Sequence, residues 1–192
     1  MGFAPATGAG CGRGRQLGHD RRAVELSDRR LGPLSGKPSW AVYDPVRDHF
    51  LVNVAQPASV AVIDPGTAAV LGSWTVQSPG PHGLDLDGDG GRVFVACDGG
   101  DVICLDADDG RELGRVPIAG GPDAIWVDPA RSRLYVAIGH PGVVQVVDTG
   151  RMAITETLAT EEGAKTTALD IRRRILYVFR PASCSIAAFQ IA

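Results

Sequence analysis

The chain has 192 residues, 44% of them hydrophobic and 21% charged, which is enough for one domain with a buried core. Its net charge of −3 gives no electrostatic reason to expect nucleic acid or an anionic membrane surface as a partner. No run approaches the roughly 20 apolar residues of a membrane-spanning helix, and 25 Gly and 13 Pro favour many short strands joined by turns.

Residues 1–22 are rich in Gly and Arg and have no apolar periodicity, which predicts a disordered tail. The Arg cluster lacks the interleaved aromatic residues of a nucleic-acid-binding arm, so a solvated tail is the favoured interpretation. The tail also lacks the apolar segment of a signal peptide, so the sequence as written predicts a cytoplasmic protein. An extracytoplasmic location stays open if the N-terminus is wrongly assigned.

Residues 23–192 form a predicted repeat domain. The same pattern of short apolar segments and turns is written four times, with a period of about 42 residues. Asp44 and Asp128 lie two periods apart, and Tyr135 and Tyr177 lie one period apart. The segments are rich in β-branched or aromatic residues and are too short for helices, which is typical of antiparallel strands joined by tight turns.

The strands are predicted within four units that span about residues 38–80, 81–121, 122–162 and 163–192. In chain order they are 39–42, 49–54, 60–63 and 70–76; then 83–86, 92–97, 102–105 and 112–118; then 124–127, 134–138, 143–147 and 152–158; and, as third strand of the last unit, 186–191.

The last unit lacks a fourth strand, whereas residues 31–34 resemble a spare fourth strand ahead of the first unit. We therefore expect residues 31–34 to close the ring by pairing with the last unit, which would hide two sheet edges. A ring of four blades is at the low end of the range found in propellers. Two alternatives stay open: the chain is a fragment of a larger propeller, or it completes a ring as a homodimer.

Three segments, Arg133-Leu134-Tyr135-Val136-Ala137 and its counterparts at 92–96 and 175–179, resemble the second-strand motif of the YVTN β-propeller repeats. The ending Val62-Ile63-Asp64 is similar to that family's third strand. The resemblance covers about residues 37–192 and implies an all-β propeller of four-stranded antiparallel blades, about four in this chain. It leaves function open, because such blades serve both binding scaffolds and enzymes.

Asp recurs at the starts of equivalent turns, where a carboxylate accepts hydrogen bonds from backbone N–H groups two or three residues later. These residues are Asp44, Asp64, Asp106, Asp128, Asp148 and Asp170. Residues 85–90 match the opening of a calcium loop, but Ala96 stands where that loop needs a bidentate Glu. Turn capping is the favoured interpretation, and neither a metal site nor a cofactor is predicted.

Cys97 and Cys104 flank one hairpin and are expected to be buried free thiols. With Gly99 and Gly100 as the central residues of the turn, the two sulfurs would lie diagonally on the sheet, too far apart for an easy disulfide. Trp40, Trp74 and Trp126 are expected to pack between blades.

The candidate site lies at the mouth of the central channel. The innermost strand of each blade starts there, and the aligned positions are Ser39, His82, Asp123 and Lys165. Loops between second and third strands reach the same rim and bring Gln56, Asp98, His140 and Ser183. An imidazole, carboxylates and an ammonium group that converge on a concave surface would suit a binding pocket.

Two functions remain open. The favoured one is a non-enzymatic scaffold that binds a protein or a small ligand at the channel mouth, with Ser39, His82, Asp98, Asp123, His140 and Lys165 as candidate contacts. The alternative is a propeller enzyme of the lactonase or hydrolase type, in which His82 and Asp123 form an acid–base pair with or without a divalent metal. No residue is assigned as catalytic.

Overall fold

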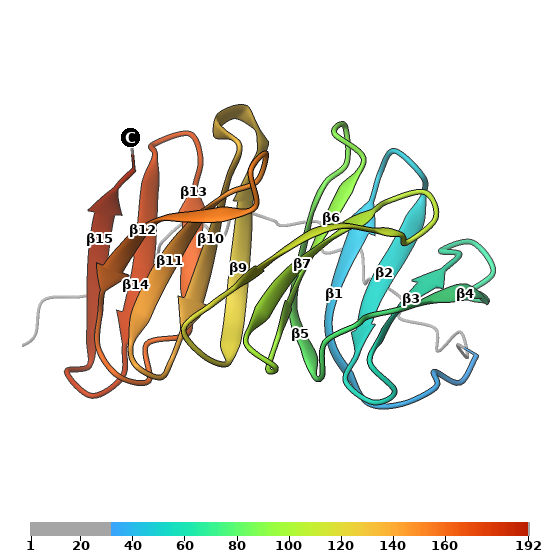
Figure 1. Cartoon of the computed structure of the whole chain (residues 1–192), viewed down its shortest axis with the longest axis horizontal. Coiled ribbons are helices and arrows are strands. Elements are labelled where there is room, and N and C mark those ends of the chain that lie inside the picture. Colours follow the sequence, from blue (N-terminus) through green and yellow to red (C-terminus); the bar gives the residue numbers. More distant parts are fainter. Residues whose placement is uncertain (1–31, 192) are drawn as a thin grey trace, which may run out of the picture.

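All the strands belong to antiparallel sheets built by successive hairpins. The computed structural model describes residues 32–191, drawn in colour in Figure 1, so the predicted tail 1–22 lies outside the described residues. The first sheet holds β1 (Pro38–Asp44), β2 (His49–Val54), β3 (Ser59–Ile63) and β4 (Val70–Thr75), and the second sheet holds β5 (Pro81–Asp87), β6 (Arg92–Cys97), β7 (Asp101–Asp106) and β8 (Glu112–Pro117). The third sheet holds β9 (Pro122–Asp128), β10 (Arg133–Ile138), β11 (Val143–Asp148) and β12 (Ala153–Ala159). The fourth sheet holds β13 (Thr167–Asp170), β14 (Ile175–Arg180) and β15 (Ser185–Gln190).

This arrangement confirms the predicted all-β fold of four-stranded antiparallel blades, with three strands in the last blade. The helical structure among residues 32–191 is one 3-10 turn, η1 (Pro129–Arg131), and no helix in this part of the chain could cross a membrane. Irregularities recur at equivalent places: the pairing of first and second strands shifts between Pro38 and Ala41, and again between Pro81 and Gly83. The sequence repeat is therefore a structural repeat.

Successive sheets pack face to face, and their first strands β1, β5, β9 and β13 contact one another in order. We call the side of a sheet that faces the next sheet along the chain its forward face, and the other side its backward face. Three apolar layers fill the spaces between sheets. Leu51 and Val60 meet Val93 in the first layer, Phe94 meets Leu134 in the second, and Tyr135 meets Leu176 in the third.

Burial on both faces explains why the middle strands read as continuous apolar runs rather than as an alternation. β3 is buried at all five of its residues, whereas the outer strands β4 and β12 are largely exposed. Trp40 and Trp74 pack against the layer between the first and second sheets, and Trp126 against the layer between the third and fourth. The predicted role of the three Trp residues in packing between blades is confirmed.

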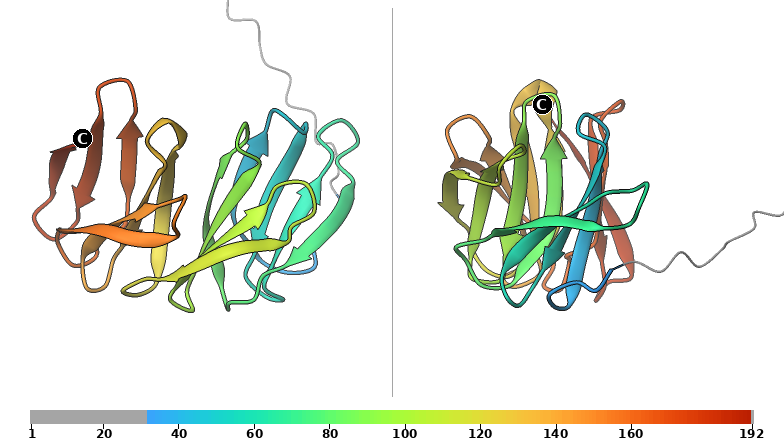
Figure 2. Two further views of the ribbon diagram at one scale, coloured as in Figure 1. Left: turned by 45° about the horizontal axis from the view of Figure 1, so that its top comes forward. Right: turned by 90° about the vertical axis from the view of Figure 1, so that its right-hand side faces the viewer.

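The sheets form an open row rather than a closed ring. Figure 1 and the left view of Figure 2 place the first sheet and the fourth sheet at opposite ends. In the described part of the chain, the fourth sheet has the order β13-β14-β15. Of the predicted closing strand 31–34, residue 31 lies outside the described residues; Gly32 N–H donates to the carbonyl of Ala68, and Leu34 packs against the first sheet. The closing pairing stays a prediction.

The recurring Asp residues cap turns, as predicted. Asp44 accepts hydrogen bonds from the N–H groups of Val46 and Arg47 at 2.9 and 3.3 Å, and equivalent bonds occur at Asp64, Asp106, Asp148 and Asp170. Asp128 is the exception: it makes no capping hydrogen bond to a backbone N–H, and its Oδ2 pairs with the Arg131 guanidinium at 3.0 Å. Within residues 32–191, no group of three or more His, Cys, Asp or Glu side chains could hold a metal ion.

The predicted placement of Cys97 and Cys104 is wrong in register. Cys97 lies opposite Asp101 and Cys104 opposite Phe94, because Gly100 N–H donates to the Cys97 carbonyl and Gly100 adopts a φ of +87°. The turn therefore holds three residues rather than two, and this one-residue change puts the two side chains on opposite faces of the sheet. Both thiols are free and buried, as predicted.

Candidate functional site

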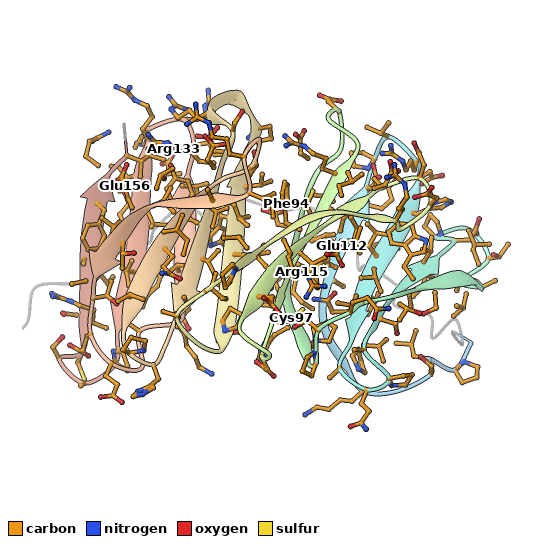
Figure 3. The ribbon with its side chains drawn as sticks, in the orientation of Figure 1. Phe94, Cys97, Glu112, Arg115, Arg133 and Glu156 are labelled. Atoms are coloured by element: carbon orange, nitrogen blue, oxygen red, sulfur yellow. The ribbon has the colours of Figure 1, made fainter. Side chains whose placement is uncertain are left out.

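The starts of β5 and β9 bring a His and an Asp together at one rim of the row. His82 is the second residue of β5 and Asp123 the second residue of β9, and these strands are neighbours. His82 Nε2 lies 3.2 Å from Asp123 Oδ1. Figure 3 labels Cys97, the last residue of β6, near this rim, and Arg133 at the opposite rim.

Two more predicted rim residues join this pair. Asp98, just after β6, places Oδ1 3.4 Å from His82 Nδ1, and Lys165, just before β13, places Nζ 3.4 Å from Asp123 Oδ2. The four side chains thus form a chain of ion-pair contacts, Asp98–His82–Asp123–Lys165, that links the second, third and fourth sheets. We call these four residues the rim cluster.

The rim cluster combines a partly buried centre with exposed ends. The side chains of His82 and Asp123 are 35% and 21% exposed, whereas those of Asp98 and Lys165 are 58% and 57% exposed. A neutral imidazole carries one N–H and can donate to only one of its two carboxylate neighbours.

Ser39 and His140 do not join the rim cluster. Ser39 Oγ donates to the Pro81 carbonyl at 2.7 Å, so its hydroxyl ties the first sheet to the start of β5. His140 Nδ1 lies 2.9 Å from Glu162 Oε1, and both side chains are largely exposed. These two predicted contacts therefore share the rim with the cluster but have different partners.

A groove of about 600 Å³ opens beside Asp98, between the first and second sheets. Its walls come from the loop after β2 and the segments on either side of β5 and β6: Ala55, Gln56, Pro57, Ala58, Pro79, Gly80, Asp98 and Gly99. The lining is mainly apolar, with the carboxylate of Asp98 as its one ionisable group. An elongated apolar group ending in a cation would match this lining.

Two residues that hold the site were not identified from the sequence. Asn53 on β2 is fully buried, and its Nδ2 donates to the carbonyls of His82 and Gly83, each at 3.0 Å. Gly80 has a φ of +64°, and a Cβ there would lie 2.8 Å from Asp98 Oδ2. An Asn inside a strand and a Gly before a Pro carry no distinctive sequence signal, because both also occur for purely structural reasons.

No protein-family model matches this chain, and no curated protein matches it. Similar solved structures include Kuenenia stuttgartiensis hydrazine synthase, with 19% identity over 83% of this chain and 49% of that chain and a TM-score of 0.72. The computationally designed Ika4 protein has 11% identity over 87% of this chain and all of that chain, with a TM-score of 0.72. The β-propeller domain of Myceliophteria thermophila Cps50 (Swd1) has 15% identity over 83% of this chain and 57% of that chain, with a TM-score of 0.65.

The chain thus spans only about half the length of the hydrazine synthase and Swd1 chains that it matches. At these identities the similarity establishes the fold alone. Together with four face-to-face antiparallel sheets, it shows that this chain has a β-propeller fold.

Proposed function

We propose that the chain is a non-enzymatic propeller scaffold, with repeats of the YVTN type, that binds a protein or a small ligand at the rim that carries His82. The observation that supports this most is convergence: side chains from three sheets form the rim cluster directly beside a groove of about 600 Å³. Sites of this kind combine an apolar lining with a few polar groups that fix the orientation of the ligand.

The charges of the cluster favour a cationic ligand group. The cluster holds the carboxylates of Asp98 and Asp123 against the single ammonium group of Lys165. Asp98 is the exposed carboxylate, and it stands in the wall of the groove beside Pro57 and Pro79. The ligand would be a Lys or Arg side chain of a partner protein or a small organic amine, with its carbon chain along the prolines.

The test uses immobilised hexapeptides with a central Lys or Arg between apolar residues, and a matched set with Glu in the central position. We expect the cationic set to be retained and the Glu set to pass through. Asp98→Asn should weaken retention of the best cationic peptide about tenfold, because it removes the charge with little change of shape. Asp89→Asn, an exposed carboxylate in the turn before β6 and thus at the opposite rim, is the matched control.

A double variant tests the rest of the cluster. His82→Ala with Asp123→Ala should reduce retention further while the far-UV circular dichroism stays that of the parent. Equal retention of both peptide sets, or unchanged binding by a folded double variant, would remove the rim as a binding site.

One distance favours the alternative function, an enzyme of the lactonase or hydrolase type. His82 Nε2 and Asp123 Oδ1 are 3.2 Å apart, the contact that an acid–base pair needs. The other imidazole nitrogen faces Asp98, however, so neither nitrogen is free of a carboxylate neighbour. Hydrolysis of γ-butyrolactone and p-nitrophenyl acetate, with and without Ca²⁺, tests this function: turnover that His82→Ala abolishes would establish it over the scaffold.

A further inference from the structure

The forward face of the fourth sheet is uncovered. Strand pairing places Val60, Val102, Val144 and Ile186 at equivalent positions of the third strands. The first three are at most 1% exposed because the next sheet covers them, whereas Ile186 is 60% exposed. Its cross-strand neighbour Phe179 is 39% exposed. This face has the position and the apolar character of an inter-sheet contact, but no sheet of residues 32–191 lies in front of it.

The backward face of the first sheet is only partly covered: Leu34 packs against Val54 and its buried neighbours, but no sheet of residues 32–191 lies over Phe50. Phe50 occupies the position of Val93, Leu134 and Leu176 in the other second strands; those three are 0% exposed, and Phe50 is 41% exposed. Beside Phe50 an apolar groove of about 270 Å³ is lined by Val52, Ile63, Asp64, Pro65 and Ala68. A groove at one end of the row therefore faces outward, as do the large apolar side chains at the other end.

The chain also approaches the first sheet as it would from a preceding sheet. Ala55 N–H donates to the Lys37 carbonyl at 3.1 Å, as Asp98 N–H donates to the Gly80 carbonyl at 2.9 Å where the chain passes from the first sheet to the second. Gly36 packs against the Gln56 carbonyl as Gly120 packs against the His140 carbonyl. Residues 36 and 37 thus follow the path that joins two neighbouring sheets.

We propose that these two faces bind each other between two copies of this chain: the forward face of the fourth sheet of one copy covers the backward face of the first sheet of the other, and the same contact repeated closes a two-chain ring. The contact would be a fourth inter-sheet layer of the kind that already occurs three times within the chain. Ile186 and Phe179 would pack against Phe50 and its groove.

The number of sheets favours two copies. The four sheets of residues 32–191 give eight in a pair, the upper end of the range of four to eight blades found in propellers, whereas three copies would give twelve. The match to 57% of the Swd1 β-propeller domain agrees that four sheets are about half of a propeller of that size. Within residues 32–191, the first and fourth sheets lie at opposite ends of the row and do not contact each other (Figure 1).

Charge at the opposite rim supports the same pairing. Within the chain, Arg47 in the turn after β1 donates to Asp108 of the next sheet. The equivalent turn of the fourth sheet holds the exposed Arg172, Arg173 and Arg174, and Arg172 and Arg174 form no ion pair among the described residues. The turn after β3, which Asp64 starts, would face these arginines in the partner copy. Opposite charges would thus meet across the proposed contact.

The experiment measures the mass of the full chain by light scattering after gel filtration at micromolar concentration. One chain has a mass of 20.1 kDa, so the proposal expects about 40 kDa for the wild type. Ile186→Glu and Phe50→Glu should each reduce the mass to that of one chain, because a buried carboxylate in an apolar contact is unfavourable. Leu113→Glu is the matched control: Leu113 is 43% exposed on β8, an outer strand of the second sheet.

Mixing the two variants shows which faces meet. The Ile186→Glu chain keeps an intact first sheet and the Phe50→Glu chain an intact fourth sheet, so their mixture should regain a two-chain species through one contact. A monomeric wild type, or a Phe50→Glu variant that remains dimeric, would overturn the proposal. Circular dichroism and cooperative urea unfolding of each variant separate lost association from lost folding, and the wild-type mass is decisive without any variant.

Discussion

The backbone N–H of Val127 donates a hydrogen bond of 2.7 Å to Asp85 Oδ2, so a carboxylate on β5 takes up a backbone donor of the neighbouring innermost strand β9. Burial raises the pKa of Asp85 above its usual range, and the hydrogen bonds from the N–H groups of Val127 and Leu86 oppose this only in part. Asp85 therefore joins two sheets, and its burial between them disfavours the ionised form of its carboxyl group.

We expect Asp85→Asn to be at least as stable as the wild type at neutral pH. A raised folded-state pKa means that the contribution of Asp85 to stability is fully present below the unfolded pKa of about 3.9 and is lost as the pH rises through the folded value. Asn keeps an oxygen for the Val127 N–H and removes the buried charge, while its NH2 group takes the place of the oxygen that accepts from the Leu86 N–H at 2.9 Å. Thermal unfolding near pH 4 and at about pH 7 should show an advantage of Asn over Asp only at the higher pH.

Asp85→Ala separates the hydrogen bond from the charge. Removing the acceptor leaves the buried N–H of Val127 unpaired, which should lower the free energy of unfolding by about 1–3 kcal/mol at either pH. If the Asn variant were as destabilised as the Ala variant, the carboxylate would be a favourable buried charge and the raised pKa would be wrong.

Asn53 should be important for stability although it lies in no predicted site. Its Nδ2 is the donor for the carbonyls of His82 and Gly83 across the first inter-sheet layer. Asn53→Ala is expected to cost about 1–3 kcal/mol in urea unfolding, and Asn53→Asp more, because a carboxylate would then face two carbonyl oxygens. Arg151→Ala, at an exposed turn position, should stay within about 0.5 kcal/mol of the wild type. A stable Asn53→Asp would contradict this assignment.

The fold could be predicted from the sequence because the repeat determines both the order of the strands and the face of the sheet to which each side chain points. Once Tyr135 and Tyr177 are aligned, every strand of one unit has a counterpart in the next. The proximity of His82 and Asp123 was equally accessible, since both stand at the start of neighbouring innermost strands. Alignment to a rim position does not determine side-chain direction, however. Ser39 donates to a carbonyl and His140 pairs with Glu162, and both contacts depend on packing that no repeat pattern records.

The hairpin at Cys97 shows a second limit. Gly99 and Gly100 suggested a two-residue turn, but the turn holds three residues, and one extra residue moves a side chain to the opposite face. Turn length is decided by one or two backbone torsions at Gly, which sequence patterns specify poorly. The predicted burial of the thiols is nevertheless confirmed, because both faces of the second sheet are covered by other sheets.

The thiols of Cys97 and Cys104 should be unreactive in the folded protein because they are buried. Burial raises the pKa of Cys97 to about 12 and that of Cys104 to about 11, so almost no thiolate forms at neutral or mildly alkaline pH. In a Cys11→Ser, Cys184→Ser variant we expect no reaction with a disulfide reagent in the native state and release of two equivalents after unfolding in urea. Rapid native-state reaction of either thiol would show that the sheet opens locally or that the burial is wrong.

Gly110 should be the least replaceable glycine of the second sheet. It has a φ of +73° in the turn after β7, and a Cβ there would overlap the indole ring of Trp74, which belongs to the first sheet. Backbone strain alone should cost about 1–3 kcal/mol in Gly110→Ala. Displacement of the indole would add to this cost and weaken the first inter-sheet layer, so Trp fluorescence should change together with the unfolding midpoint.

Gly72→Ala is the control, because a Cβ at Gly72 meets open space and the residue lies in β4. Less chain entropy in the unfolded state should leave that variant as stable as the wild type or slightly more stable. If both variants unfolded at the same urea concentration, the contact between Gly110 and Trp74 would not be part of what holds the first two sheets together.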